Sequence, residues 1–264
     1  MKLSSANINV MIKACRKAAK VLIRDFGEIE KLQVSVKGPG DFVTASDKKV
    51  EKILVEELQK ARPSYSILSE ELGQINNNNN EEFRWIIDPI DGTANFLHGI
   101  PHFAISIGLE QNKEIISGII YDPIKDEMFA AEKGNGSYLN NSRIRVSVRS
   151  KLKDCIIFTG GPRQNAKKKD LSLAEYNKLS SIVQTPIRKM GSAALDMAYT
   201  AAGRCDGFWH RNLKYWDYAA GIVIVKEAGG FVTDFMGNQE YVESETILAT
   251  NSRISEEMIK VLKL

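Results

Sequence analysis

The chain has 264 residues, of which 43% are hydrophobic and 26% charged, and both values are ordinary for a folded globular protein. They exclude a chain that is disordered, collagen-like or coiled coil throughout, and the length suffices for one large domain or two small ones. The 36 basic and 33 acidic residues leave a net charge of only +3, so the charge balance does not demand a nucleic-acid partner.

The cysteines and the N-terminus bear on the compartment. Cys15, Cys155 and Cys205 are too few and too scattered for a disulfide scaffold, and they form no CxxC pair that would indicate zinc. Basic residues between positions 13 and 20 interrupt the apolar residues of the N-terminus, so we expect no signal peptide. No stretch approaches the roughly 18 apolar residues of a membrane span. These features predict a cytoplasmic protein with reduced cysteines and no membrane contact.

The first elements in chain order are two helices. Apolar residues recur at three- and four-residue steps over residues 8–26, and Ser4 or Ser5 can cap the start of this helix. A second helix begins near Ser46 and ends before Pro63.

Short strands follow, and beyond a polar seam at residues 150–154 strands alternate with helices. Strands are predicted at 64–68, 83–87, 103–109, 115–121, 127–132, 156–159, 207–210, 231–233 and 247–249. Helices are predicted at 171–183, 192–202, 218–227 and 255–264. The asparagine run at 76–80 is predicted to be an exposed loop. The alternation in the second half favours a mixed or parallel sheet covered by helices.

Two aspartates at the end of an apolar strand are the strongest chemical pattern. Asp88 directly follows the strand at 83–87, and Asp91 comes three residues later, before Gly92. Converging carboxylates repel one another unless a cation lies between them, and Mg²⁺ prefers oxygen ligands, to which the carbonyl of Ile90 could add. The alternative is a plain Asp-Gly turn in which Asp88 is only a cap.

Further acidic residues lie at the ends of other predicted elements. Glu70 and Glu71 follow an apolar strand, Asp217 opens a helix, and Asp47 lies in the first turn of the second helix. For each of them the alternative to a chemical role is a solvated loop, or a helix cap favoured by the helix dipole.

Residues 191–194, Gly-Ser-Ala-Ala, open another predicted helix. Small residues there leave backbone N–H groups accessible to a phosphate, although close packing of the helix on a sheet would also explain them. The chain has no GxSxG motif, and His98, His102 and His210 have no zinc-binding spacing. Carboxylates for two or more metal ions beside an anion cradle favour metal-assisted hydrolysis by an activated water.

The motif Asp-Pro-Ile-Asp-Gly-Thr at residues 88–93, with Asn95, resembles the inositol monophosphatase family, and the overall pattern is similar to its bacterial SuhB-type members. Glu-Glu at 70–71 and Trp-Asp-Tyr-Ala-Ala-Gly at 216–221 belong to the same resemblance, which covers nearly the whole chain.

The resemblance implies a layered αβαβα sugar-phosphatase fold, of α+β or α/β class, and usually a homodimer. We expect an N-terminal lobe at residues 1–150 with a mainly antiparallel sheet that carries Glu70 and the 88–93 motif. A C-terminal lobe at residues 151–264, with a mixed sheet, would carry the Gly-Ser-Ala-Ala and Trp-Asp motifs, and the two lobes would form one functional unit.

The resemblance also implies site residues. Two or three Mg²⁺ ions would be held by Glu70, Asp88, the carbonyl of Ile90, Asp91 and Asp217. Thr93 with Asp47 would orient or deprotonate the attacking water, and Glu71 would be a further catalytic residue. The phosphate and substrate would be surrounded by Gly92, Thr93, Gly191, Ser192 and Ala193.

His210 departs from the family pattern. The inositol enzymes of the family carry a glutamate seven residues before the second-half aspartate, where it binds the polyol hydroxyls, and this chain has His210 there. Arg211 and Lys214 follow in a segment expected to border the pocket. We therefore predict that His210 contacts the substrate. With histidine at this position, the protein should have a looser preference for polyols and should better tolerate substrates with a second phosphate. The alternative is that His210 only packs on its strand.

The resemblance implies Mg²⁺-dependent hydrolysis of phosphate monoesters, foremost of inositol 1-phosphate to inositol and phosphate, and such enzymes are often inhibited by lithium. Within enzymes, the alternatives are a 3′(2′),5′-bisphosphate nucleotidase and a fructose bisphosphatase. An alternative of another class is an antitermination factor of the SuhB type, which associates with RNA and RNA polymerase.

Overall fold

The computed structural model describes residues 5–29, 34–38, 41–75, 82–161 and 169–263, so the predicted loop at 76–80 lies outside the described residues. Both N-terminal helices are confirmed as α1 (Ala6–Phe26) and α2 (Ala45–Ala61). The Ser5 hydroxyl accepts a hydrogen bond from the N–H of Ile8 at 3.2 Å, which makes Ser5 the N-cap of α1.

An eight-stranded sheet occupies the first half of the chain. Its strands are β3 (Ser66–Ser69), β4 (Gly73–Ile75), β5 (Phe83–Asp91), β6 (Ala104–Gln111), β7 (Glu114–Asp122), β8 (Glu127–Glu132), β9 (Gly136–Leu139) and β10 (Ser142–Arg143). They are ordered β10-β9-β8-β7-β6-β5-β3-β4, and only β3 and β5 pair in parallel. The expectation of a mainly antiparallel sheet is therefore confirmed. A separate hairpin joins β1 (Val34–Gly38) and β2 (Asp41–Thr44).

A four-stranded sheet occupies the second half. Its order is β11 (Ile157–Thr159), β12 (Gly207–Arg211), β14 (Thr246–Thr250) and β13 (Phe231–Thr233). The β11–β12 pair is parallel and the other two pairs are antiparallel, so the sheet is mixed, as expected. The helices of this half are α4 (Lys169–Ser180), α5 (Ala193–Ala201), α6 (Tyr215–Glu227) and α7 (Ser255–Leu262).

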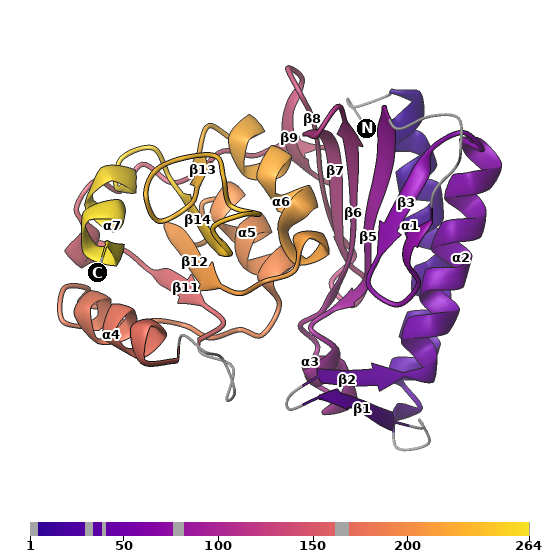
Figure 1. Cartoon of the computed structure of the whole chain (residues 1–264), viewed down its shortest axis with the longest axis horizontal. Coiled ribbons are helices and arrows are strands. Elements are labelled where there is room, and N and C mark those ends of the chain that lie inside the picture. Colours follow the sequence, from indigo (N-terminus) through magenta and orange to yellow (C-terminus); the bar gives the residue numbers. More distant parts are fainter. Residues whose placement is uncertain (1–4, 30–33, 39–40, 76–81, 162–168, 264) are drawn as a thin grey trace.

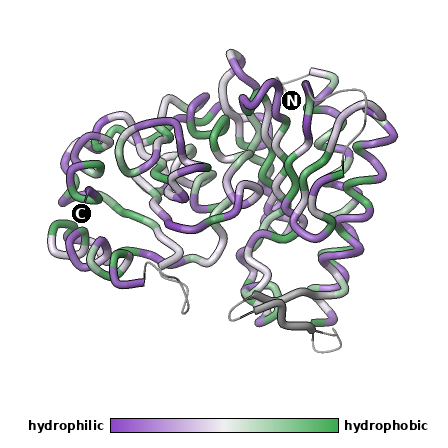
Figure 2. Tube along the Cα trace, viewed as in Figure 1, coloured by the Kyte–Doolittle hydropathy of each residue, from purple (hydrophilic) through white to green (hydrophobic). Residues whose placement is uncertain are grey.

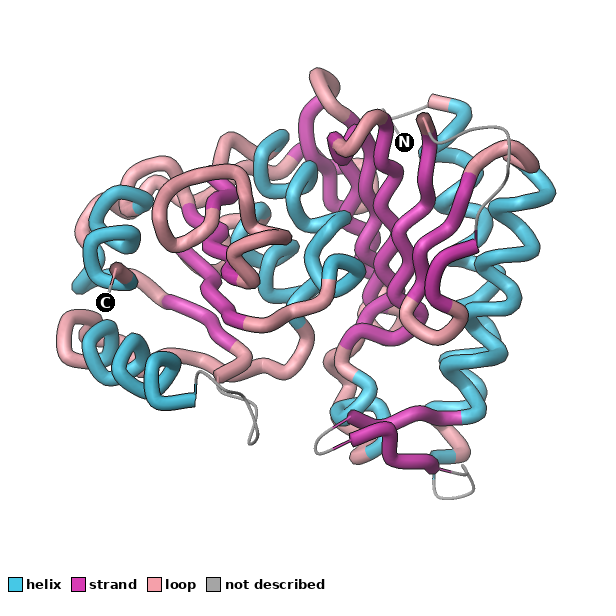
Figure 3. The backbone as a smooth tube through the Cα atoms, viewed as in Figure 1, coloured by secondary structure: helices cyan, strands magenta, loops and turns pink. Residues whose placement is uncertain are grey.

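The helices and sheets form five layers, the αβαβα arrangement that was expected (Figure 1). α1 and α2 cover one face of the eight-stranded sheet, α5 and α6 fill the space between the two sheets, and α4 and α7 cover the outer face of the smaller sheet. The same succession of helical and strand layers is visible in Figure 3. Within the described ranges, no helix combines the length and apolarity needed to span a membrane.

Three hydrophobic clusters fill the interfaces between these layers. Figure 2 shows hydrophobic segments along the strands, while α1 and α2 alternate between hydrophilic and hydrophobic residues. That alternation is expected of helices with one face in water. α6 is different, because every residue from position 217 to position 225 is buried between the two sheets.

Candidate active site

The two motif aspartates lie on a bulge at the end of β5. The strand was predicted to end at residue 87, but it continues to Asp91. Asp88 pairs with Ser106 and Asp91 with Ala104, so β5 has one more residue than its partner between these pairs. Such a bulge bends the strand and redirects its side chains. Gly92 follows with a φ of 96°, which a residue with a Cβ adopts only with strain.

Asp88 is a buried acid with other acids around it. Its side chain is 2% exposed, and its Oδ1 accepts a hydrogen bond from the N–H of Ile90 at 3.0 Å. Burial raises the pKa of Asp88 well above its usual range, and the negative charges of Glu70, Asp91, Asp217 and Asp47 raise it further. The fold therefore brings the acids predicted for this site within electrostatic reach of one another, although they come from separate elements.

Asp91 is held by the N-terminus of α5. The Ser192 hydroxyl donates to its Oδ2, and the N–H of Ala194 donates to the same oxygen at 2.7 Å. Burial raises the pKa of Asp91, and these hydrogen bonds oppose that effect. Ser192 also caps α5 by accepting the N–H of Leu195 at 3.3 Å. The helix start at residues 191–194, predicted to bind phosphate, thus binds the carboxylate of Asp91. The N–H of Ala194, which was expected to be accessible to phosphate, is already used by this carboxylate.

Asp217 lies in the first turn of α6, which begins at Tyr215 rather than at residue 218 as predicted. The predicted alternative made Asp217 the N-cap, but the N-cap is Lys214, and Asp217 lies three residues later, where its Oδ2 accepts the N–H of Lys214 at 2.9 Å. The start of α6 is anchored to the eight-stranded sheet, because the Tyr215 hydroxyl donates to Glu110 at 2.8 Å, and Glu110 pairs with Arg84 at 2.8 Å.

Glu51, on the same helix as Asp47, binds the Glu70-Glu71 turn, and sequence reasoning missed it. Asp47 is buried in the first turn of α2, and Glu51 lies one helical turn later on the same face. The Glu51 carboxylate accepts the N–H of Glu71 at 3.0 Å and that of Leu72 at 3.4 Å. The four-residue spacing from Asp47 on a predicted helix was the available signal. Glu70 and Glu71 themselves are half-buried.

Thr93 and Ile90 are direct neighbours at the site. The Thr93 hydroxyl donates to the carbonyl oxygen of Ile90 at 2.9 Å. The hydroxyl predicted to orient water therefore lies beside the carbonyl predicted to bind a cation.

The donor set has the chemistry of a magnesium site, because it consists of carboxylate and carbonyl oxygens. Within the part of the chain that the structure describes, however, no three acidic, histidine or cysteine side chains form a ready ion-binding group. Asp88, Asp91 and Asp217 each direct an oxygen to a backbone N–H donor. The residues fit Mg²⁺ because their ligand atoms are oxygens and because a cation would relieve the repulsion between their charges.

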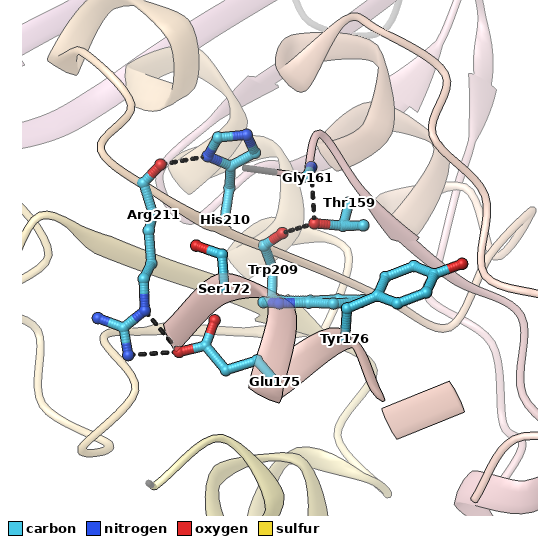
Figure 4. A pocket seen from close by; sticks show the side chains of 8 residues that line it. All are labelled: Thr159, Gly161, Ser172, Glu175, Tyr176, Trp209, His210 and Arg211. Atoms are coloured by element: carbon cyan, nitrogen blue, oxygen red, sulfur yellow. Dashed lines mark hydrogen bonds and ion pairs between the residues drawn. The ribbon is translucent and has the colours of Figure 1, made fainter. Parts of the chain in front are cut away.

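His210 and Arg211 lie on opposite faces of β12 (Figure 4). The His210 ring is 7% exposed and its Nδ1 lies 2.5 Å from the carbonyl of Arg211, while a Cβ on Gly160 would overlap the ring. Arg211 pairs with Glu175 of α4 at 2.5 Å and stacks on Phe235. The expectation that Arg211 helps to attract a second phosphate is wrong, because this carboxylate already neutralises it. Both side chains line a cavity of about 10 Å³, room for about one water.

Asp196 is a second buried acid that the sequence analysis missed. It lies on α5, is 1% exposed, and neither carboxylate oxygen has a hydrogen-bond partner among the described residues. Burial raises its pKa well above the usual range, and the charge of Asp91 adds to this. An acidic residue within an apolar helix was the available signal.

Comparison with known proteins gives one consistent result. The sequence profile described as "Inositol monophosphatase family" matches residues 5–263. The chain is 47% identical to an "Inositol-1-monophosphatase" of Mesorhizobium japonicum, over 98% of this chain and 97% of that protein. It is 38% identical to a "Nus factor SuhB" of Pasteurella multocida, over 97% of this chain and 95% of that protein.

A solved structure extends the likeness to the fold. The structure titled extragenic suppressor protein suhB from Bartonella henselae is 49% identical, with a TM-score of 0.94 over 98% of this chain and 99% of that chain. The resemblance expected from the motifs is thereby confirmed, and the chain belongs to the inositol monophosphatase family.

Proposed function

We propose that this chain, which its family makes a phosphomonoesterase, uses Mg²⁺ to hydrolyse inositol 1-phosphate to inositol and phosphate. The observation that carries the proposal is the raised pKa of Asp88, to which four other carboxylates contribute. Buried acids that repel one another are costly to a fold, and a bound divalent cation would relieve the repulsion. Two or three ions would be held by Glu70, Asp88, the carbonyl of Ile90, Asp91 and Asp217.

The other site residues have complementary roles. Bound Mg²⁺ would lower the pKa of a water molecule that it binds, and it would neutralise negative charge on the phosphoryl group. Thr93, with Asp47 and Glu71, would orient the attacking water and accept its proton. Gly92, Gly191, Ser192 and Ala193 would surround the phosphoryl group at the N-terminus of α5, where backbone N–H groups favour an anion. His210 would contact the polyol.

The test is substitution of Asp88. Asp88→Asn removes a carboxylate proposed to bind Mg²⁺. We expect kcat to fall at least about 10³-fold, which corresponds to a loss of about 4 kcal/mol of transition-state stabilisation. The fold should persist, because the substitution removes a repulsion. Glu114→Gln is the matched control, since Glu114 is 58% exposed and pairs with Lys133. Released phosphate would be measured with inositol 1-phosphate, adenosine 3′,5′-bisphosphate and fructose 1,6-bisphosphate. Wild-type-like turnover by Asp88→Asn at saturating Mg²⁺ would refute the assignment.

A second candidate function is favoured by the relative named Nus factor SuhB. It is association with RNA and RNA polymerase in antitermination. If the Asp88→Asn variant still binds RNA and RNA polymerase, the result would support a role separate from catalysis. If the variant loses phosphatase turnover, the result would support the enzymatic function.

Three further properties belong to the same proposal. The chain would form a homodimer, which light scattering at defined concentration would reveal. Lithium would inhibit turnover. The protein would work in the cytoplasm, where Cys15, Cys155 and Cys205, all buried and unpaired among the described residues, would stay reduced.

A further inference from the structure

Asn95 of the recognised motif joins two segments that are far apart in the chain. It lies on α3 (Thr93–Leu97) and is half-buried. Its side-chain Nδ2 donates to the carbonyl of His102 at 2.7 Å and to the carbonyl of Met190, 95 residues away, at 2.9 Å. Because an amide nitrogen carries two hydrogens, these two bonds use its full donor capacity.

The backbone packs tightly around this amide. A Cβ on Gly191, whose φ is 90°, would lie 2.9 Å from Nδ2 of Asn95. A Cβ on Gly92 would lie 3.1 Å from the carbonyl of His102 and 3.2 Å from that of Gly191. The turn after β5, the segment before β6 and the loop before α5 therefore approach one another closely at Gly92 and Gly191, and the Asn95 side chain bonds to two of these segments. Both acceptors are carbonyl oxygens, so a side chain without two donors would leave at least one of them unsatisfied.

The position of this contact matters for the site. Met190 directly precedes the Gly-Ser-Ala-Ala segment, whose Ser192 hydroxyl and Ala194 N–H hold Asp91. Asn95 comes four residues after Asp91 and directly follows the turn that carries it. Asn95 therefore joins the carboxylate-bearing turn to the residue before Gly191, while Asp91 joins the same turn to two residues after Gly191.

We propose that Asn95 is a positioning residue that aligns the N-terminus of α5 with the carboxylate turn and thereby sets the affinity for the phosphoryl group. The inference rests on the proposed function, because it assigns the phosphoryl group to this junction. Asn95 itself contacts neither substrate nor ion, and acts through the backbone at residues 190–191.

The test compares two uncharged substitutions with a matched control. Asn95→Ala truncates the side chain, and Asn95→Leu keeps a branched shape, so a deficit common to both reports the lost donors. Asn251→Ala is the control, because buried Asn251 likewise donates through Nδ2 to two partners, Ser147 at 2.8 Å and Arg149 at 3.1 Å, both more than 100 residues away. Binding of inorganic phosphate in the presence of Mg²⁺ would be measured by calorimetry on the folded fraction, beside kcat and KM.

We expect both Asn95 variants to weaken phosphate binding at least about fivefold and to lower kcat/KM about 10- to 100-fold, since a misplacement of about 1 Å can cost 10²-fold. Asn251→Ala should lose stability but keep the wild-type phosphate affinity. Asn95 variants with wild-type phosphate affinity and kcat/KM would overturn the inference while leaving the proposed function intact. A deficit equal to that of Asn251→Ala would also overturn it. A wild-type protein that neither binds phosphate nor turns over would overturn both proposals.

Discussion

At the scale of single residues, hydrogen bonding decides what each buried acid can do. Asp206 is fully buried, yet it accepts the N–H of Ile156 at 2.8 Å and bonds with Ser147 and Arg149. Asp196 is as deeply buried and has no such partners within the described chain. The sequence predicted Asp88 and Asp91 because they follow an apolar strand. It could not separate Asp196 from Asp206, because their partners come from distant segments.

The contrast predicts that amide substitution has opposite effects on stability at the two acids. The pKa of Asp196 is raised in the folded state, so its stabilising contribution is present below the unfolded value near 4 and is lost as the pH rises. Asp196→Asn should therefore raise the free energy of unfolding at pH 8 by at least about 1 kcal/mol, the scale of one pKa unit. Urea titrations between pH 5 and 8, with EDTA present, would measure it. Asp206→Asn should instead lower the free energy of unfolding, because the Asp206 carboxylate accepts hydrogen bonds from Ser147, Arg149 and the N–H of Ile156. A gain for Asp196→Asn that does not grow with pH would contradict the assignment.

His210 offers a test of substrate selection. Because Arg211 is paired with Glu175, the test concerns residue 210 itself. His210→Glu should raise kcat/KM for inositol 1-phosphate several-fold and lower kcat/KM for a bisphosphate. His210→Gln is the control, because glutamine has the length of glutamate but no charge. Hydrogen bonds to a charged group are worth about 1.5–3 kcal/mol. If Glu and Gln variants agree within twofold on both substrates, residue 210 only packs on its strand.

At the scale of elements, the long elements were predicted most closely, and the short ones were predicted only in part. The long helices α1 and α2 and the strands β6, β7 and β8 match their predicted ranges closely, because several residues repeat the period. Short elements have too few residues to show a period. Those of two to five residues that were missed are β1, β2, β4, β9, β10 and α3, whereas β3, β11, β12, β13 and β14 were predicted. α6 was predicted from its apolar run, but a helix that is apolar all round does not reveal which face meets which sheet.

Two glycines on neighbouring strands test how closely α6 packs. A Cβ on Gly118 of β7 would lie 2.6 Å from the carbonyl oxygen of Ala220 and 2.8 Å from Val223. A Cβ on Gly108 of β6 would lie 3.4 Å from Ala219, an ordinary contact. Gly118→Ala should therefore destabilise the protein by about 1–3 kcal/mol, as overpacking does, and Gly108→Ala by less than about 1 kcal/mol. Chemical denaturation would measure both, and equal effects would show that α6 shifts to make room.

At the scale of the whole molecule, the candidate site draws on layers from both halves of the chain. Asp88 and Asp91 end a strand of the larger sheet, Asp47 lies on the outer helix α2, and Asp217 begins α6 between the sheets. An ion bound by these residues would link elements that the chain connects only through long segments. We therefore retain the division into lobes at 1–150 and 151–264 as a proposal, with the site at their junction.

This arrangement predicts that Mg²⁺ stabilises the molecule globally. A ligand that binds only the folded state adds about 2.7 kcal/mol at 100 times its Kd. Calorimetry at constant ionic strength should show a Tm that rises with Mg²⁺ and falls when EDTA removes it. Asp88→Asn should lose this response and Glu114→Gln should keep it. A Tm that is independent of Mg²⁺ in the wild type would contradict the proposed ion site.

The sequence alone determined the family, the long elements and the acidic motif residues, because hydrophobic period and motif spacing are local properties of the chain. Only the tertiary structure decided which partners those residues meet. The bulge that places Asp91 opposite Ala104 depends on pairing between strands, and the bond from Ser192 to Asp91 joins residues 101 apart. The ion pair that removes Arg211 from the predicted pocket depends on packing of α4 against β12. Such contacts form between distant segments during folding, so no local pattern in the sequence specifies them.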